Sequence, residues 1–132
     1  MKRPNLDSML LASADPDRLR DWYAAVLDPA DNDTMDQYRV LRFGTFHLLI
    51  DQRDDIGART ADPTRMILNF DVGDARAVAA LMDERGTEWV APLEDRDGSL
   101  FATAKDPDGN YVQIIQMSEE HLAAMERGDF GQ

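Results

Sequence analysis

The chain has 132 residues, enough for one domain with a substantial core and too few for two independent domains. It carries 26 acidic and 14 basic residues, and this net charge of −12 argues against nucleic acid and anionic membranes as partners. Cysteine is absent, which excludes disulfides, thiolate metal ligands and a thiol nucleophile.

The first half of the chain predicts a strand, a helix and a hairpin. Asp15 and Pro16 supply a helix cap and a first-turn proline. Trp22 lies on the apolar stripe of the helix that follows, where we expect it in the core. Residues 28–34 favour a loop, with at most a short edge strand, and Gly44 is the expected hairpin turn. The predicted strands of this half span residues 8–14, 37–43 and 46–51.

The second half repeats this order and adds a last helix. Asp74 is the predicted cap of the second helix, and Ser118 is the predicted cap of the last one. Dense turn chemistry occupies Asp106 to Asn110, where Pro107 fixes its own φ angle and Gly109 is free to take a positive one. A chain reversal is therefore expected just before the last strand. The predicted strands span residues 66–72, 88–94, 100–104 and 111–117.

The two halves resemble each other in their residues as well as in their elements. Gly44 aligns with Gly109, and each helix cap falls seven residues after a position in the first strand of its half. This self-similarity predicts two copies of one supersecondary unit that share a core. We expect a single domain over 1–132, and the runner-up fold is a ferredoxin-like α+β sandwich. The expected parts are module one at about 6–52, a linker at 53–64, module two at about 65–117 and a C-terminal helix at 118–127.

Three segments of the chain resemble the vicinal oxygen chelate superfamily, which includes glyoxalases, extradiol dioxygenases, fosfomycin-modifying enzymes and bleomycin-binding proteins. These are Leu10 to Leu27, Phe70-Asp-Val-Gly-Asp74 and Asp106-Pro-Asp-Gly-Asn-Tyr-Val-Gln113, the last being the most specific. The resemblance implies an α+β fold in which two βαβββ modules form a curved mixed sheet around a ligand cleft, followed here by a C-terminal helix. It also implies a homodimer.

In this superfamily, His, Gln or Glu side chains that face the cleft hold a divalent metal. The resemblance transfers those positions to Ser8, Leu48, Ile67 and Gln113. Of these, only Gln113 is a plausible ligand, and one amide does not provide the three or four donors that a metal needs. A shift of one residue would bring His47 to the cleft in place of Leu48, and the donors would still be too few. We therefore predict neither a metal nor a cofactor.

Strand alternation predicts which side chains line the cleft. For Asn69 and Gln113 two interpretations stay open, a satisfied core amide and a ligand contact. Trp89 is expected to stack on the ligand, Arg42 to lie at a solvated edge and His121 to face solvent. The expected lining residues are Ser8, Leu10, Leu48, Ile50, Ile67, Asn69, Trp89, Tyr111, Gln113 and Ile115.

The leading hypothesis is metal-independent binding of a small organic molecule, a drug or secondary metabolite, as in the bleomycin-resistance branch. The excess of acidic residues fits a cationic ligand, and it fits a well-solvated surface even better. The alternative is a glyoxalase-like lyase, isomerase, cyclase or oxygenase, with or without a divalent metal. In it, side chains such as Ser8 or Tyr111 would polarise the substrate, although no histidine is expected near Ser8. The apolar run from Met9 to Ala12 is too short for a signal peptide, so we expect a cytoplasmic protein.

Overall fold

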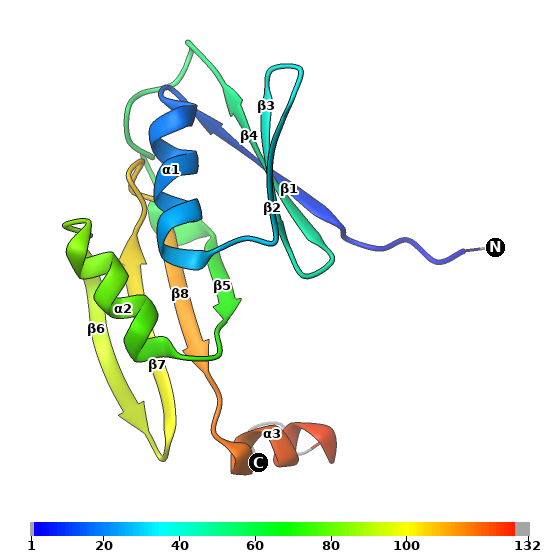
Figure 1. Ribbon diagram of the computed structural model, residues 1–132, viewed down its shortest axis with the longest axis vertical. Coiled ribbons are helices and arrows are strands. Elements are labelled where there is room, and N and C mark those ends of the chain that lie inside the picture. The colour runs from blue at the N-terminus through cyan, green and yellow to red at the C-terminus, as the bar shows by residue number, and fades with distance from the viewer. Residues whose placement is uncertain (1, 129–132) are drawn as a thin grey trace. The chain divides into compact units, whose positions relative to one another are not determined.

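The structure is a computed structural model that describes residues 2–128, and its chain divides into two compact units, Met1–Ala61 and Asp62–Gln132. The boundary falls within the linker predicted from the sequence. Each unit contains one four-stranded mixed sheet and a helix against it, and the second unit adds a C-terminal helix (Figure 1). The fold is therefore α+β, as predicted.

Both units follow the same path. The first unit consists of β1 (Ser8–Ser13), α1 (Pro16–Leu27), β2 (Asp31–Met35), β3 (Tyr38–Phe43) and β4 (Phe46–Gln52). The second consists of a short 3-10 turn (Pro63–Arg65), β5 (Ile67–Asp71), α2 (Ala75–Glu84), β6 (Trp89–Arg96), β7 (Ser99–Lys105), β8 (Tyr111–Gln116) and α3 (Glu119–Glu126).

The strand orders are β1-β4-β3-β2 and β5-β8-β7-β6, so each first strand pairs in parallel with the last strand of its own module. This identical topology confirms the two βαβββ modules.

In the first unit, α1 covers one face of the sheet. Asp15 caps the helix by accepting a hydrogen bond from the Arg18 backbone N–H, and Trp22 is buried as predicted. Beneath the helix lie Leu41, Leu48 and Ile50, which are at most 2% exposed. We call this side the helix face of the sheet and the opposite side its open face. The same names apply to the second sheet, where α2 defines the helix face.

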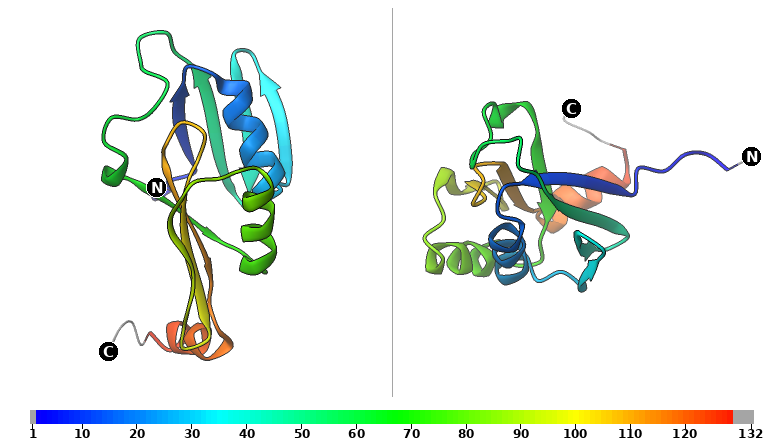
Figure 2. Two further views of the ribbon diagram at one scale, coloured as in Figure 1. Left: turned by 90° about the vertical axis from the view of Figure 1, so that its left-hand side faces the viewer. Right: turned by 90° about the horizontal axis from the view of Figure 1, so that it is seen from above.

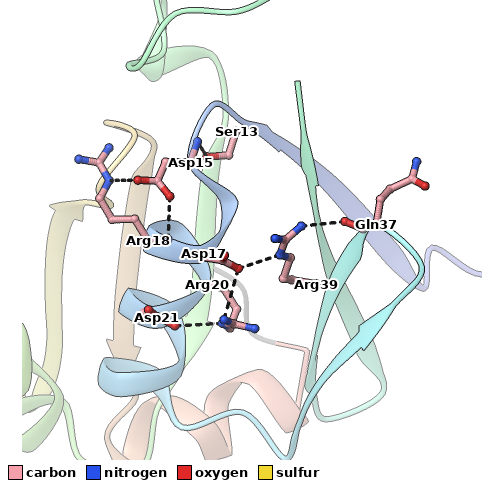
Figure 3. Close-up of polar contacts among 8 residues, drawn as sticks. All are labelled: Ser13, Asp15, Asp17, Arg18, Arg20, Asp21, Gln37 and Arg39. Atoms are coloured by element: carbon pink, nitrogen blue, oxygen red, sulfur yellow. Dashed lines mark hydrogen bonds and ion pairs between the residues drawn. The ribbon is translucent and has the colours of Figure 1, made fainter. Parts of the chain in front are cut away.

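An ion pair fixes β3 to α1 on the helix face. The Arg39 Nε lies 2.9 Å from the Asp17 Oδ1, and the Arg39 Nη1 donates to the backbone carbonyl of Gln37 at 2.9 Å (Figure 3). The hydrogen bond from Arg39 lowers the pKa of the Asp17 carboxyl below its ordinary value.

In the second unit, α2 packs on the face that carries Ala102, Ala104, Val112 and Ile114, which are at most 1% exposed. The Gln116 side chain reaches the start of this helix, where its Oε1 accepts the Ala75 N–H at 2.8 Å. The helix face of the second sheet is therefore apolar in its centre, and at one end Gln116 accepts a backbone N–H from the start of α2.

Two predicted boundaries differ from the structure. Residues 31–35 form a strand, β2, at the outer edge of the first sheet, where the prediction allowed a short edge strand within a loop. The strand β6 continues to Arg96, so the turn is confined to Asp97 and Gly98, where both residues have positive φ angles. In the hairpin between β3 and β4, Gly44 has a φ of +60°, which confirms the predicted turn.

Candidate ligand-binding face

The open face of the second sheet carries a polar row between two mostly apolar rows. Asn69 in β5 is opposite Gln113 in β8, and Gln113 is opposite Thr103 in β7. These three side chains form a polar row through the middle of the sheet. On either side lie the flanking rows, made of Ile67, Tyr111 and Lys105 on one side and Asp71, Ile115 and Phe101 on the other.

The central amides of this face are available to a ligand. Within residues 2–128, neither the Asn69 nor the Gln113 side chain hydrogen-bonds to another residue. Asn69 is exposed and Gln113 is half-buried, and no buried side-chain polar atom in that part of the chain lacks a partner. The Gln113 amide therefore reaches solvent, and the interpretation of both residues as satisfied core amides is wrong.

The turn before β8 sets the register that aligns this row. Asp106 is 2% exposed, and its Oδ1 accepts the backbone N–H groups of Asp108 and Asn110, each at 2.9 Å. Its Oδ2 accepts the Asn110 side-chain amide at 2.9 Å. Gly109 has a φ of +85°, as predicted. A buried carboxylate with three donors thus fixes Asn110, the residue before β8, which helps to set Gln113 opposite Asn69.

Trp89 lies on the other side of the sheet. It is paired with Ala104, a buried residue of the helix face, and its indole Nε1 donates to the Asp83 Oδ1 in α2 at 2.7 Å. The prediction that Trp89 stands in the lining with Gln113 is therefore wrong. The indole packs against the end of α2, where the Asp83 carboxylate satisfies its only donor.

On the first sheet, the pairing places His47, and not Leu48, beside Ser8. Ser8 is the partner of His47 in the parallel pair of β1 and β4, so the two residues share the open face. Leu48 and Ile50 point to the helix face, and the prediction that they share a side with Ser8 and Leu10 is wrong, as is the statement that Ser8 has no histidine nearby. The sequence contained a signal for this arrangement. Positions 46, 48 and 50 are all apolar, as expected of a buried face, whereas positions 47 and 51 on the opposite face are His and Asp.

Arg42 extends this open face. It is the partner of His47 on one side and of Asp31 on the other, so β3 is an inner strand and not the solvated edge that was predicted. The Arg42 Nε lies 2.5 Å from the Asp31 Oδ2, and its Nη1 donates to the Gly44 carbonyl at 2.7 Å.

The C-terminal helix is fastened at the hairpin between β6 and β7 (Figure 2). Ser118 caps α3, and its backbone N–H donates to the Ser99 Oγ at 2.8 Å. His121 is half-buried, and its Nδ1 hydrogen-bonds to the same Ser99 Oγ. The prediction that His121 faces solvent is therefore wrong.

The side chains at the metal positions implied by the resemblance do not suit a metal ion. Leu48 faces α1, Ile67 has no donor atom, and Ser8 and Gln113 offer a neutral hydroxyl and a neutral amide. Over residues 2–128, no group of three or more His, Asp or Glu side chains is placed to hold a metal ion. In the same range, no helix is long and apolar enough to cross a membrane.

Residues 8–115 match the model of the glyoxalase-like domain, so the chain belongs to this family of the vicinal oxygen chelate superfamily. A search of curated proteins gave no significant match.

Solved structures share the fold at low sequence identity. A glyoxalase/bleomycin resistance protein from Albidiferax ferrireducens T118 is similar with a TM-score of 0.70 and 18% identity over 84% of this chain and 98% of that one. A virulence protein from Salmonella typhimurium gives a TM-score of 0.68 and 23% identity over 89% of this chain and 100% of that one. The oxidase ChaP-H1 gives a TM-score of 0.72 and 19% identity over 88% of this chain and 98% of that one.

Proposed function

We propose that the chain is a cytoplasmic protein that binds a small organic molecule, a drug or secondary metabolite, on the open face of the second sheet without a metal ion. The observation that carries this proposal is the pair of Asn69 and Gln113. The two amides stand side by side, have no protein partner within residues 2–128 and lie between two flanking rows that are mostly apolar. A pair of amides between mostly apolar rows suits a molecule with one or two hydrogen-bonding groups on a carbon skeleton.

The surroundings of the pair add detail to the proposal. Ile67 is 48% exposed, and covering it with an apolar ligand would remove that surface from water. Asp71 lies on the same face and has no ion-pair partner in the described part of the chain, so a cationic group on the molecule would be favoured. The net charge of −12 also favours a positively charged ligand.

Native mass spectrometry of the purified chain tests the proposal, because it detects an organic molecule retained from the cell. With that molecule in hand, calorimetry on Gln113→Ala measures the contribution of the central amide. We expect a loss of about five-fold or more in affinity, the equivalent of one hydrogen bond of about 1 kcal/mol. Gln52→Ala is the matched control, since Gln52 is exposed at the end of β4. Equal affinities in the two variants would contradict the assignment of the face.

The second candidate is a glyoxalase-like enzyme, a lyase, isomerase or oxygenase that acts on the same kind of molecule. The observation that favours it is the imidazole of His47 next to the hydroxyl of Ser8, because a histidine can act as a general acid or base. A retained molecule that is returned chemically changed by the wild-type chain, and unchanged by His47→Gln, would establish the enzyme and exclude simple binding.

A homodimer is part of the same proposal. Met35 lies on the open face of the first sheet and is 63% exposed, which is apolar surface that a second copy would cover. Sedimentation velocity across a range of concentrations should give the mass of two chains. A single species with the mass of one chain would refute the dimer and leave the binding face untouched.

A further inference from the structure

Three hydrogen-bond donors form one row across the open face of the first sheet. Ser8 is opposite His47, and His47 is opposite Arg42. Because neighbouring strands lie about 4.8 Å apart, the hydroxyl, the imidazole and the guanidinium are adjacent. Each has a hydrogen-bond donor on the same face of the sheet, and the guanidinium also carries a positive charge, which Asp31 partly offsets. We call these three residues the donor row.

The guanidinium of Arg42 is held in place and still has donors to offer. Its Nε is paired with the Asp31 carboxylate, and its Nη1 donates one hydrogen to the Gly44 carbonyl. Within residues 2–128, the Arg42 Nη2 has no partner, and neither has the side chain of Ser8 or His47. A guanidinium that is already oriented loses less conformational entropy when it binds an anion, which favours binding.

An apolar strip borders the donor row. Two residues along each strand from the donor row lie Leu10, Leu49 and Val40, which are paired across β1, β4 and β3. Leu10 is 52% exposed, and the other two are half-buried. A molecule with an apolar body and one polar end would therefore find a matching surface here.

The carboxylates of this face lie away from the middle of the row. Asp31 is occupied by Arg42, and Asp33 is on the outer strand β2, opposite Val40. Asp51 is four residues from His47 along β4, a separation of about 13 Å. The space above Ser8 and His47 is therefore bordered by donors and not by negative charge.

We propose that the donor row binds an oxyanion, a carboxylate or phosphonate group, on a small molecule whose apolar body lies on Leu10, Leu49 and Val40. This proposal concerns a different face from the amide pair of the second sheet and assigns a ligand chemistry to it. The expectation of a cationic ligand came from the total charge of the chain and from Asp71 on the second sheet. The groups that face the middle of the donor row are hydrogen-bond donors, and the charge of Arg42 is already paired with Asp31.

The experiment compares probes that differ only in the charged group. The full chain, labelled with nitrogen-15, is titrated with 4-phenylbutyrate, with 3-phenylpropylphosphonate and with 4-phenyl-1-butanol, which has the same apolar body and no charge. We expect saturable shifts of the amide signals of residues 8, 42 and 47 with at least one of the two anions. The alcohol should bind about ten-fold more weakly or worse, because hydrogen bonds to charged groups are the strong ones.

The variants Arg42→Gln and Arg39→Gln separate the donor row from a general effect of charge. Both arginines belong to β3, and each pairs its Nε with an aspartate and its Nη1 with a backbone carbonyl. Arg39 lies on the helix face, so it is a matched control. Arg42→Gln should weaken anion binding about ten-fold, and Arg39→Gln should change it less than two-fold. His47→Gln is the second variant, which retains a donor of similar size and should weaken binding only moderately.

Several results would overturn the proposal. These are equal binding of the alcohol and the anions, equal effects of the two arginine variants, or no shift at residues 8, 42 and 47 at millimolar anion. The relative affinities for the two anions decide between a carboxylate and a phosphonate ligand. Shifts at Asn69 and Gln113 report on the function proposed above, so failure at one face does not count as failure at the other.

Discussion

Replacing Leu48 and Leu49 one at a time tests which side of the first sheet is the open one. Leu48 is 2% exposed beneath α1, whereas its neighbour Leu49 is half-buried on the open face. Changing Leu48 to Ala removes three carbons from the core, a transfer cost of about 2.4 kcal/mol at about 0.8 kcal/mol per carbon. The cavity that remains raises the expected loss to about 3 kcal/mol or more. Leu49→Ala should cost less than about 1.5 kcal/mol, because part of its side chain is already in water.

Urea unfolding followed by far-ultraviolet circular dichroism measures both losses as changes in the free energy of unfolding. The two variants have the same composition, so any difference between them reflects position alone. The reasoning would be refuted if Leu49→Ala were the more damaging of the two. That result would place Leu48 on the open face with Ser8, as we predicted from the sequence.

Three further substitutions test other parts of the structure. Asp106→Ala removes the carboxylate that holds the turn before β8, so the free energy of unfolding in urea should fall by about 2–3 kcal/mol. A fall below about 0.5 kcal/mol would show that the turn holds without this carboxylate. Arg39→Gln should raise the pKa of Asp17 towards its ordinary value in an NMR titration, and an unchanged pKa would refute the pair. Because the pKa of Asp17 is lowered in the folded chain, the pair stabilises the fold at pH values above the ordinary pKa of aspartate. This contribution is lost as the pH falls through the lowered pKa of Asp17 in the folded chain. Ser99→Ala removes the contact of α3 at the β6–β7 hairpin, and hydrogen exchange should quicken in 119–126 while β8 stays protected; unchanged exchange in α3 would show that other contacts hold it.

Local sequence signals were sufficient for most of the fold. Asp15, Asp74 and Ser118 cap their helices as predicted, because a cap depends on residues only three positions apart. The turn residues Gly44 and Gly109 have positive φ angles for the same local reason. The repeat of these signals in both halves predicted the paired modules.

The errors concern which face of a strand is covered, and this is not a local property. The segment from Phe46 to Ile50 is apolar on both faces apart from His47, so alternation groups its residues without saying which group meets α1. The hairpin at Gly44 gives the missing step, since it pairs Arg42 with His47 and puts two polar residues on one face. Trp89 was misplaced for a different reason. Its partner Asp83 belongs to α2, and no sequence pattern marks a hydrogen bond from a strand to the end of a helix.

The central claim is that the polar row of the second sheet is a binding surface for organic molecules. An NMR screen of small organic fragments tests it most directly, with the side-chain amide signals of Asn69 and Gln113 and the indole signal of Trp89 as reporters. Binding fragments should shift both amides and leave the indole, which lies on the helix face, unchanged. Fragments that shift the indole while both amides stay still, or a screen in which no fragment moves Gln113, would contradict the account.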